Sequence, residues 1–493
     1  ASRDRRGKNP SGGQSVMKLK ELLERVEVIE TNMDAETEIR DITNDSTKVK
    51  DGDLYICLKG LKADGNDFIN ELEDKACGYV TERKPREGIK YVLVKDARAA
   101  FSIICQNYFG NPANGMKFVA VIGTNGKTST SHMINGILNY AGFKTGLLGT
   151  LGHFIVGEKV GESLTTPDPY EFNKLLNQMR CRGVDVVVSE VSAHAIALKK
   201  LYGIKSDVAI LTNITQDHLD FFENFEKYAE TKASYFTPEY TKLAIVNVDD
   251  KEGRKIAQNA KVTTVTYGTN EPSDVFALDI FPDMDGTKFV VNLFDDILDI
   301  KSPFYGMFNV YNLMAAMTAA KALGVSSEVI TAAVRRLKPV DGRFNILKNN
   351  KGFIIIDYAH TPDGLENLLT TARTLTKARL ITVFGCGGDR DASKRKIMGM
   401  TASKLSDMVI LTSDNPRFED PEKIIADIES GVSGVDCRSF VNRYDAITYA
   451  MNEMQEGDTV VIAGKGAENY IEIKGKKIPY SDTEAVLRRG ARK

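Results

Sequence analysis

The sequence predicts an α/β protein of three domains, and three observations support this prediction. The 493 residues exceed what one hydrophobic core usually holds, and a norm of about 150 residues per domain suggests three units. Short apolar runs alternate with helical patterns over most of the chain, which is typical of parallel sheets joined by crossover helices. Turn residues interrupt this alternation near residues 111–115 and 338–343, where we expect domain boundaries.

The composition is that of an ordinary soluble globular protein. Hydrophobic residues make up 42% of the chain and charged residues 27%, which argues against a disordered, collagenous or disulfide-scaffold protein. The 65 Lys and Arg residues nearly balance the 67 Asp and Glu residues, so we expect neither a nucleic-acid partner nor an anionic membrane partner. No apolar run approaches the ~18 residues that span a bilayer. The six widely separated cysteines form no CxxC pair, which favours a reducing, cytoplasmic location.

The N-terminal part is expected to hold a leader and then a small α/β domain. Residues 1–16 are rich in Arg, Gly and Ser and precede Met17, so we interpret them as an added leader and exclude them from the fold. The domain is predicted over residues 17–112, where the helical pattern LKELLERV opens the segment. The apolar runs that follow it lie at residues 53–58, 78–81 and 91–94.

The central domain is predicted over residues 113–337 and the C-terminal domain over residues 338–493. The first buried strand of the central domain, residues 117–122, runs into Gly123, and further strand-like runs alternate with helical patterns. This alternation predicts a doubly wound, mostly parallel sheet. The same alternation restarts in the last part of the chain, which predicts a Rossmann-like domain. Its strand and loop segments are FIIIDYAH, LITVFGCGG, MVILTSDNP and TVVIAGKG.

A glycine-rich loop stands between the first central strand and a helical pattern. Such a loop presents backbone N–H groups and the positive end of a helix dipole to phosphates, with Lys127 placed for the terminal phosphates and Thr128 for Mg²⁺. This makes the central domain phosphate-loop ATPase-like. The common pattern begins with Gly where this chain has Val121, and the alternative is a tight structural turn. The candidate ATP-binding residues of the loop are Gly123, Thr124, Asn125, Gly126, Lys127, Thr128 and Ser129.

Three further residues of the central domain are metal candidates. Glu190 ends the strand DVVVSE and His218 follows the strand SDVAILT, so both fall at carboxyl ends of presumed parallel strands, where open α/β sheets build their sites. A carboxylate and an imidazole could together hold a second Mg²⁺ between a phosphate and an acceptor. Lys232 lies in the helical pattern KYAETKASYF. Each also has a structural interpretation: Glu190 as a helix cap, His218 as a core histidine and Lys232 as a solvated lysine.

Four strand-end loops of the third domain should converge by the same rule of parallel sheets. They carry Arg390 and Arg417, whose planar guanidinium groups suit carboxylates, and Asp414 and Glu468, which can receive an amine. This combination predicts a zwitterionic ligand. The alternative is that the two arginines are surface ion-pair residues.

An ordered set of motifs over residues 17–493 resembles the bacterial Mur ligases, which add amino acids to the peptidoglycan precursor. The chain departs from the family pattern at Ala193, Leu198, Lys200 and Ala467. The motifs are DSTKV, GTNGKTST, LTTPDP, EVSAH, NITQDHLDFF, ETKASYF, GMFNVYN, DGRFN, DYAHTPD, GCGGDRD, DNPRFEDP and GKGAEN.

The resemblance implies a role for each matching residue. Thr128 would bind one Mg²⁺, and Lys232 matches a lysine that CO₂ converts into a carbamate, which would hold a second Mg²⁺ together with Glu190 and His218. Asn309, Asn312 and Arg343 would join the loop in binding ATP. The UDP-linked substrate would contact Ser46, Thr47, Thr165, Thr166, Ser192 and Lys200, and diaminopimelate would contact Arg390, Asp414, Asn415, Pro416, Arg417, Gly464 and Glu468.

The activity that the resemblance implies is ATP-dependent ligation of meso-diaminopimelate to the D-glutamate of UDP-N-acetylmuramoyl-L-alanyl-D-glutamate, through an acyl phosphate. The catalytic residues would be Lys127, Glu190, His218 and Lys232, the cofactor Mg²⁺, and the protein a cytoplasmic monomer. The alternatives are an L-lysine-adding homologue, a ligase of the folylpolyglutamate synthase type, and a nucleotide-dependent switch or motor. The last is disfavoured because the chain has no [NT]KxD guanine motif.

Overall fold

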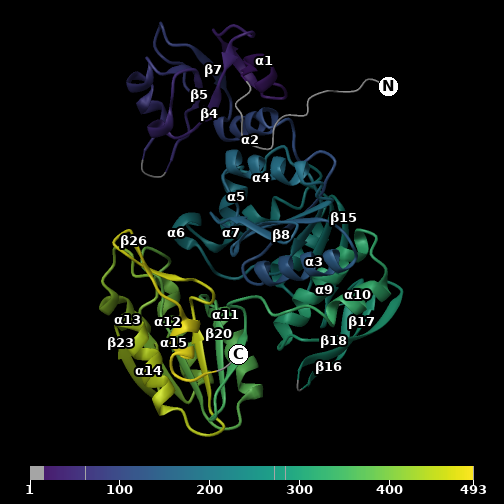
Figure 1. Cartoon of the computed structure of the whole chain (residues 1–493), viewed down its shortest axis with the longest axis vertical. Coiled ribbons are helices and arrows are strands. Elements are labelled where there is room, and N and C mark those ends of the chain that lie inside the picture. The colour runs from purple at the N-terminus through teal and green to yellow at the C-terminus, as the bar shows by residue number, and fades with distance from the viewer. Residues whose placement is uncertain (1–15, 61–62, 271, 284, 492–493) are drawn as a thin grey trace.

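The computed structural model describes residues 16–60, 63–270, 272–283 and 285–491. The leader expected at residues 1–16 lies outside the described residues except for Val16. Three main sheets follow one another along the chain, and Figure 1 shows the N-terminal elements at one end of the molecule and the C-terminal sheet at the other. The predicted α/β class is confirmed. The domain boundaries near residues 112 and 337 stay predictions.

The N-terminal sheet has five strands in the order β2-β7-β6-β5-β4, all parallel to their neighbours except β2. Helix α2 begins after Asp96, whose carboxylate caps the helix by accepting a hydrogen bond from the backbone N–H of Ala99 at 2.8 Å. The strands are β1 (Met17–Lys18), β2 (Val28–Thr31), β3 (Glu38–Ile39), β4 (Asp41–Thr43), β5 (Asp53–Ile56), β6 (Ala76–Thr81) and β7 (Tyr91–Val94), and the helices are α1 (Leu19–Leu22), α2 (Ala97–Tyr108) and the 3₁₀ turns at Ser46–Lys48, Gly65–Phe68 and Asn70–Leu72.

The central sheet has eleven strands, and its middle part is parallel, as predicted. Antiparallel strands extend both edges, and the alternation of apolar runs and helical patterns did not predict them. The strand order is β11-β10-β9-β12-β8-β13-β14-β15-β16-β17-β18. Their bounds are β8 (Lys117–Ile122), β9 (Thr145–Gly149), β10 (Gly152–Ile155), β11 (Glu158–Gly161), β12 (Val186–Val191), β13 (Ser206–Leu211), β14 (Thr241–Asn247), β15 (Thr263–Gly268), β16 (Val275–Asp283), β17 (Gly286–Leu293) and β18 (Asp296–Ser302).

Helices cover both faces of this sheet and bury the alternate side chains of each central strand. In β8, Val119 and Val121 belong to one core cluster and Ala120 and Ile122 to the other. The first cluster is covered by α3 (Lys127–Tyr140), α9 (Met307–Ala322) and α10 (Ser327–Val334), and the second by α4 (Pro169–Cys181), α5 (Ala193–Ala197), α7 (Phe225–Ala233) and α8 (Lys251–Asn259). The short helix α6 (Leu219–Phe222) follows β13.

The C-terminal sheet has six strands in the order β19-β20-β24-β21-β22-β23, and all neighbours are parallel except β19 and β20. The four predicted strands are confirmed as β20, β21, β22 and β24. The strands are β19 (Asn345–Lys348), β20 (Phe353–Asp357), β21 (Leu380–Phe384), β22 (Met408–Thr412), β23 (Asp436–Phe440) and β24 (Thr459–Ala463), with the hairpin β25 (Tyr470–Ile473) and β26 (Lys476–Pro479), and the helices are α11 (Pro362–Leu375), α12 (Ser393–Leu405), α13 (Pro421–Glu429), α14 (Arg443–Glu453) and α15 (Asp482–Leu487).

The first strand of the central sheet, β8, lies between β12 and β13: the chain passes from β8 to β9 and β12 on one side and then crosses to β13 on the other. Such a reversal of strand order opens a crevice at the carboxyl ends of the strands. The glycine-rich loop follows β8 and therefore lies at this crevice. No helix in the described part of the chain is long and apolar enough to cross a membrane.

A buried ion pair connects α14 to α15 beneath the loops of the C-terminal sheet. Arg443 Nε donates to Asp482 Oδ1 at 2.8 Å, and both side chains are fully buried. The same guanidinium donates to the carbonyl oxygens of Ser413 at 3.3 Å and Ala463 at 2.9 Å, the residues that precede Asp414 and Gly464. Arg443 thus supports two of the four strand-end loops.

We expect Arg443→Met to destabilise the C-terminal domain by about 3–5 kcal/mol, because the variant leaves the Asp482 carboxylate buried without a counter-charge. Thermal and urea unfolding followed by circular dichroism would measure the loss. In the matched double variant Arg443→Met/Asp482→Leu most of the stability should return, since no isolated charge remains. A single variant that unfolds like the wild type would contradict this account.

Candidate active site

The backbone of the glycine-rich loop requires glycine at two positions. Gly126 caps α3 with a φ of 83°, and a Cβ there would stand 2.4 Å from the Asn312 side chain. A Cβ on Gly123 would meet the Thr212 hydroxyl at 1.8 Å. Only glycine fits at these two positions, so the loop can approach β13 and α9 closely.

The Lys127 ammonium is held by the loop itself. Its Nζ donates to the carbonyl oxygens of Gly123 and Thr124, both at 2.9 Å, and burial lowers the pKa of this lysine. The Lys127 amine is therefore held against the loop that is expected to surround the phosphates. Its contact with a phosphate stays a prediction.

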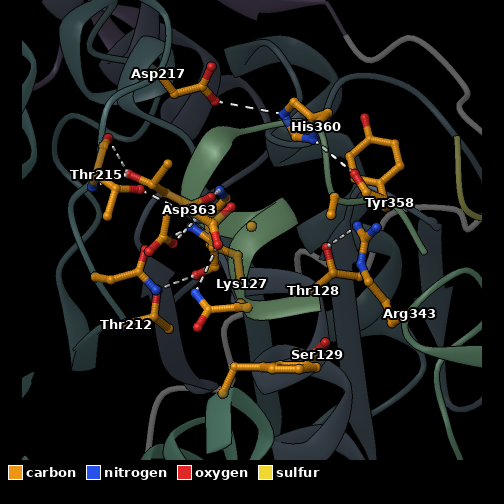
Figure 2. A pocket seen from close by; sticks show the side chains of 18 of the residues that line it. Lys127, Thr128, Ser129, Thr212, Thr215, Asp217, Arg343, Tyr358, His360 and Asp363 are labelled. Carbon is orange, nitrogen blue, oxygen red and sulfur yellow. Dashed lines mark hydrogen bonds and ion pairs between the residues drawn. The ribbon is translucent and has the colours of Figure 1, made fainter. Parts of the chain in front are cut away.

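Glu190 is neither a helix cap nor exposed: it lies within β12 and is 1% exposed. Its Oε2 accepts hydrogen bonds from the hydroxyls of Thr128 at 3.0 Å and Thr150 at 2.9 Å. Arg343 Nη2, from the opposite side, donates to the Thr128 hydroxyl at 3.1 Å, and its guanidinium carbon lies 4.3 Å from the ring centroid of Tyr358 (Figure 2). A carboxylate, a hydroxyl and a guanidinium thus meet next to the start of α3.

Lys232 is buried, so its interpretation as a solvated lysine is wrong. It lies on α7 and is 1% exposed, and its Nζ bonds to Tyr228 Oη at 2.5 Å and Thr124 Oγ1 at 3.0 Å. Among the described residues, Lys232 forms no ion pair with a carboxylate. Burial, together with the nearby Lys127 charge, lowers the pKa of Lys232 well below its usual range. These conditions favour a neutral amine.

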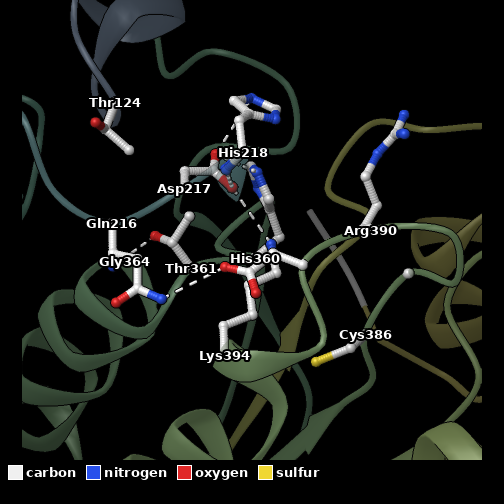
Figure 3. A network of polar contacts seen from close by, with 12 residues as sticks. Thr124, Gln216, Asp217, His218, His360, Thr361, Gly364, Cys386, Arg390 and Lys394 are labelled. Carbon is white, nitrogen blue, oxygen red and sulfur yellow. Dashed lines mark hydrogen bonds and ion pairs between the residues drawn. The ribbon is translucent and has the colours of Figure 1, made fainter. Parts of the chain in front are cut away.

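Asp217 connects the central domain to the C-terminal domain. Its carboxylate is buried and lies 3.4 Å from His218 Nε2, 3.7 Å from His360 Nε2 and 3.5 Å from Lys394 Nζ, and Figure 3 shows the three side chains gathered around it. Burial opposes ionisation, but the nearby His360 imidazole and the positive charge of Lys394 hold the pKa of Asp217 well below its usual range. Burial also lowers the pKa of His218 to about 3, so its imidazole is neutral at pH 7.

Another contact between these domains lies beside the glycine-rich loop. Asn125 Nδ2 donates to Asp363 Oδ2 at 2.8 Å, and Thr361 Oγ1 donates to Asn125 Oδ1 at 3.3 Å. The glycine-rich loop therefore bonds directly to the start of α11 in the C-terminal domain.

One pocket of about 670 Å³ lies between the two domains. The strand-end loops of the central and C-terminal sheets form opposite walls, and Figure 2 shows side chains of both domains pointing into it. The predicted residues that line it are Thr124, Asn125, Gly126, Lys127, Thr128, Ser129, Thr165, Glu190, Ser192, His218, Asn312, Arg343, Arg390, Asp414, Asn415, Arg417, Gly464 and Glu468.

Other predicted site residues do not line this pocket. Thr166 and Lys200 support its wall: the Thr166 hydroxyl donates to the Glu190 carbonyl at 2.9 Å, and Lys200 Nζ bonds to the Thr166 carbonyl at 3.2 Å and pairs with Asp168 at 2.8 Å. Ser46 lies in a 3₁₀ turn of the N-terminal domain. The remaining predicted residues outside the lining are Gly123, Thr47, Lys232, Asn309 and Pro416.

The two predicted carboxylate receptors differ. Arg390 is exposed, lines the pocket and stands apart from the Asp217 cluster in Figure 3. Arg417 is 20% exposed; its Nε pairs with Glu472 at 3.2 Å and its Nη1 donates to the Gly388 carbonyl at 2.7 Å. The surface ion-pair alternative is therefore partly right for Arg417, which has an ion pair but also faces the pocket.

Several residues that build this site had no role predicted from the sequence. Asp217 and His360 lay inside quoted motifs, and their position beside predicted site residues was the available signal. Asp363 also lay in such a motif, DYAHTPD. Lys394 and Thr150 carried no signal, because they act through contacts with segments far away in the sequence. Lys465, in the GKGAE loop, bonds to Asn415 and Glu468 and was also missed.

Comparison with known proteins places these features in a family. The Mur ligase middle domain matches residues 121–320, the Mur ligase glutamate ligase domain matches residues 342–466, and the Mur ligase family catalytic domain matches residues 38–103. The chain belongs to the Mur ligase family. All residues that line the pocket, except Glu468, thus lie in the parts that match the middle and the glutamate ligase domains.

Relatives and solved structures of this family cover nearly the whole chain. Proteins named UDP-N-acetylmuramoyl-L-alanyl-D-glutamate–2,6-diaminopimelate ligase are similar in Syntrophomonas wolfei, at 42% identity over 96% of this chain and 99% of the relative, and in Aquifex aeolicus, at 39% identity over 97% of each. A solved structure of a ligase with the same name has a TM-score of 0.68 and 30% identity over 96% of this chain and 99% of its own.

We expect Asp217→Asn to weaken the contact between the two domains, because Lys394 and His360 lose the carboxylate that they share. Charge-assisted contacts contribute about 1.5–3 kcal/mol, so turnover should fall roughly tenfold or more. Steady-state ligase kinetics would measure turnover, and small-angle X-ray scattering should show a larger radius of gyration.

The matched control is Asp391→Asn, since Asp391 contacts Gln216 across the same boundary at 3.4 Å but is less buried. It should change both measurements little. If Asp217→Asn kept wild-type turnover and scattering, the carboxylate would have no role in holding the domains together.

Proposed function

We propose that this chain ligates meso-diaminopimelate to the D-glutamate side-chain carboxylate of UDP-N-acetylmuramoyl-L-alanyl-D-glutamate, with ATP as co-substrate, in the cytoplasmic synthesis of the peptidoglycan precursor. The observation that carries the proposal is a single pocket with the glycine-rich loop on one wall. The opposite wall holds the strand-end loops that carry Arg390, Asp414, Arg417 and Glu468, called here the acid and arginine loops. The names of the similar ligases, at 39–42% identity, support this choice of substrates.

The chemistry divides between the two walls. The glutamate carboxylate attacks the γ-phosphate of ATP, which gives an acyl phosphate and ADP, and the amine of diaminopimelate then displaces phosphate. Lys127 and the backbone N–H groups at the start of α3 would stabilise the charge on the transferring phosphoryl group. Arg343, which reaches Thr128 from the opposite side, is placed to join them. Because the nucleotide and the amine lie on different domains, both domains must meet for the second step.

The residues near Thr128 fit Mg²⁺. The Thr128 hydroxyl and the Glu190 carboxylate are buried, lie 3.0 Å apart and offer the oxygen ligands that Mg²⁺ prefers. They would hold the ion, which when bound supplies charge neutralisation for the phosphates.

A second metal site depends on modification of Lys232. No group of three or more His, Cys, Asp and Glu side chains in the described residues could hold a metal ion. A carbamate on Lys232 would add an anionic oxygen ligand near the loop, and the neutral amine that burial favours is the form that reacts with CO₂. Glu190, His218 and the carbamate are the ligands we propose.

The acid and arginine loops support diaminopimelate over L-lysine. Diaminopimelate carries a second carboxylate, which the guanidinium of Arg417 or Arg390 can bind with charge-assisted hydrogen bonds. Lysine has no such carboxylate and would place its ammonium near those cations.

For the UDP-linked substrate, we propose that Thr165 and Ser192 contact the peptide end and that Ser46 and Thr47 contact the nucleotide end.

We expect phosphate release from ATP to require the UDP-linked dipeptide together with meso-diaminopimelate, and L-lysine to be a much poorer substrate. Coupled phosphate release and mass spectrometry of the product would measure this. Release of phosphate without either substrate would favour a switch protein instead.

In Arg417→Ala, the preference for diaminopimelate over lysine should fall by roughly ten- to a hundredfold, because a charged hydrogen-bonding partner is lost. Equal efficiency of the wild type with lysine would refute the choice of amino acid.

Lys232→Ala should lose nearly all ligation while keeping the fold, since the carbamate ligand can no longer form. A short carboxylic acid such as acetate or formate should partly restore turnover by occupying the space left by the side chain. Steady-state kinetics with and without the acid would test this, with circular dichroism as the check of folding. Wild-type turnover of the variant without added acid would exclude the carbamate.

A further inference from the structure

A fully buried lysine lies behind the wall of the pocket that carries Asp414, Asn415 and Glu468, called here the amino-acid wall. Lys465 follows β24, and its side chain is 0% exposed. It does not line the pocket, whereas Gly464 before it and Glu468 after it both do. An ammonium in such a place is stable only when its charge and its three N–H groups are compensated.

Three pocket residues provide that compensation. Lys465 Nζ donates to Glu468 Oε2 at 2.9 Å and to Asn415 Oδ1 at 3.0 Å, and it lies 3.6 Å from Asp414 Oδ1. Asp414 and Asn415 follow β22, while Lys465 and Glu468 follow β24. One ammonium therefore connects two strand-end loops of the C-terminal sheet.

These contacts also fix the orientation of the Asn415 amide. Its oxygen accepts from Lys465 and from the backbone N–H of Glu472 at 2.9 Å, and its nitrogen donates to Glu468 Oε2 at 2.9 Å. A rotated amide would place its nitrogen against two donors. The same ammonium compensates Asp414 and Glu468, two carboxylates at one wall that would otherwise repel each other.

We propose that Lys465 is a positioning residue that sets the affinity of this pocket for the incoming amino acid. It touches no substrate itself; it holds Asn415 and Glu468 in place and balances the negative charge of the wall. Without it the amide can rotate, and the wall repels the carboxylates of the amino acid. The chemical class of the ligand, an amino acid with at least one carboxylate and one amine, rests on the proposed function.

The test is Lys465→Met, which keeps the length of the side chain and removes its charge. We expect the KM for the amino acid to rise roughly ten- to a hundredfold, as for the loss of a charged hydrogen-bond donor. The KM values for ATP and for the UDP-linked dipeptide should stay within about twofold of wild type. A merely structural role would raise all three together.

Two further variants complete the experiment. Lys477→Met is the matched control: Lys477 is exposed, and its Nζ lies 4.1 Å from the ring of Tyr470, the ring that Lys465 Nζ faces at 5.6 Å. It should leave all three KM values unchanged. Lys465→Gln keeps an N–H donor without the charge, so it should fold even where Lys465→Met does not and give an intermediate KM for the amino acid. The proposal is overturned if both Lys465 variants keep the wild-type KM for the amino acid, or if all three KM values rise in parallel.

The outcome can be separated from that of the proposed function. The kinetics use whichever of meso-diaminopimelate and L-lysine the wild type ligates faster, so an error in the choice of amino acid does not affect the role of Lys465. Calorimetric titration of meso-diaminopimelate into wild type and Lys465→Met gives the same comparison without turnover. Equal affinities for the two proteins would contradict the inference, whereas a wild type that ligates neither amino acid would contradict the proposed function.

Discussion

The buried carboxylate of Asp217 is the contact on which the assembly of this site most depends. The pocket exists only where the loops of two sheets face each other, and Asp217 of the central domain lies between His360 and Lys394 of the C-terminal domain. The bond from Asn125 to Asp363 and the reach of Arg343 to Thr128 add two more connections across the same boundary. All of them end at the glycine-rich loop or at the loop after β13. The position of the amino-acid wall is therefore set by the elements that are expected to bind the nucleotide.

The parallel strands and the loops that follow them were predictable from the sequence, because each strand is a short apolar run and the polar residues of the site come directly after it. The antiparallel strands β16, β17 and β18 were not foreseen. Several of their side chains are exposed, including Ile297 at 78%, so their apolar residues form no continuous buried run. Contacts between the domains were even harder to predict from the sequence. Asn125 and Asp363 are 238 residues apart, and neither residue type indicates its partner.

Lys127, Lys232 and Lys465 show why residue type alone does not define a role. The first donates to backbone carbonyls, the second has hydroxyl partners and no carboxylate in the described structure, and the third lies beside Glu468 and Asp414. Burial lowers the pKa of Lys232 and favours an amine that can be modified, whereas Lys465 bonds to Glu468 and Asn415 and orders these neighbours. The sequence predicted Lys127 where a glycine-rich loop meets a helix, and Lys127 is the first residue of α3, but the environments of Lys232 and Lys465 depend on how the chain folds around them.

The charged contacts between the domains also bear on how the enzyme can release its product. A carboxylate that becomes buried when two domains meet loses its hydration, and this loss offsets much of what it gains from the cations around it. The Asp217 cluster is therefore suited to hold the domains in register without holding them together tightly. A large apolar interface would close the same pocket with a stronger, less reversible association. Polar contacts at the boundary thus agree with the reaction that we propose, in which the site closes for amide bond formation and opens to exchange ADP and product for new substrates.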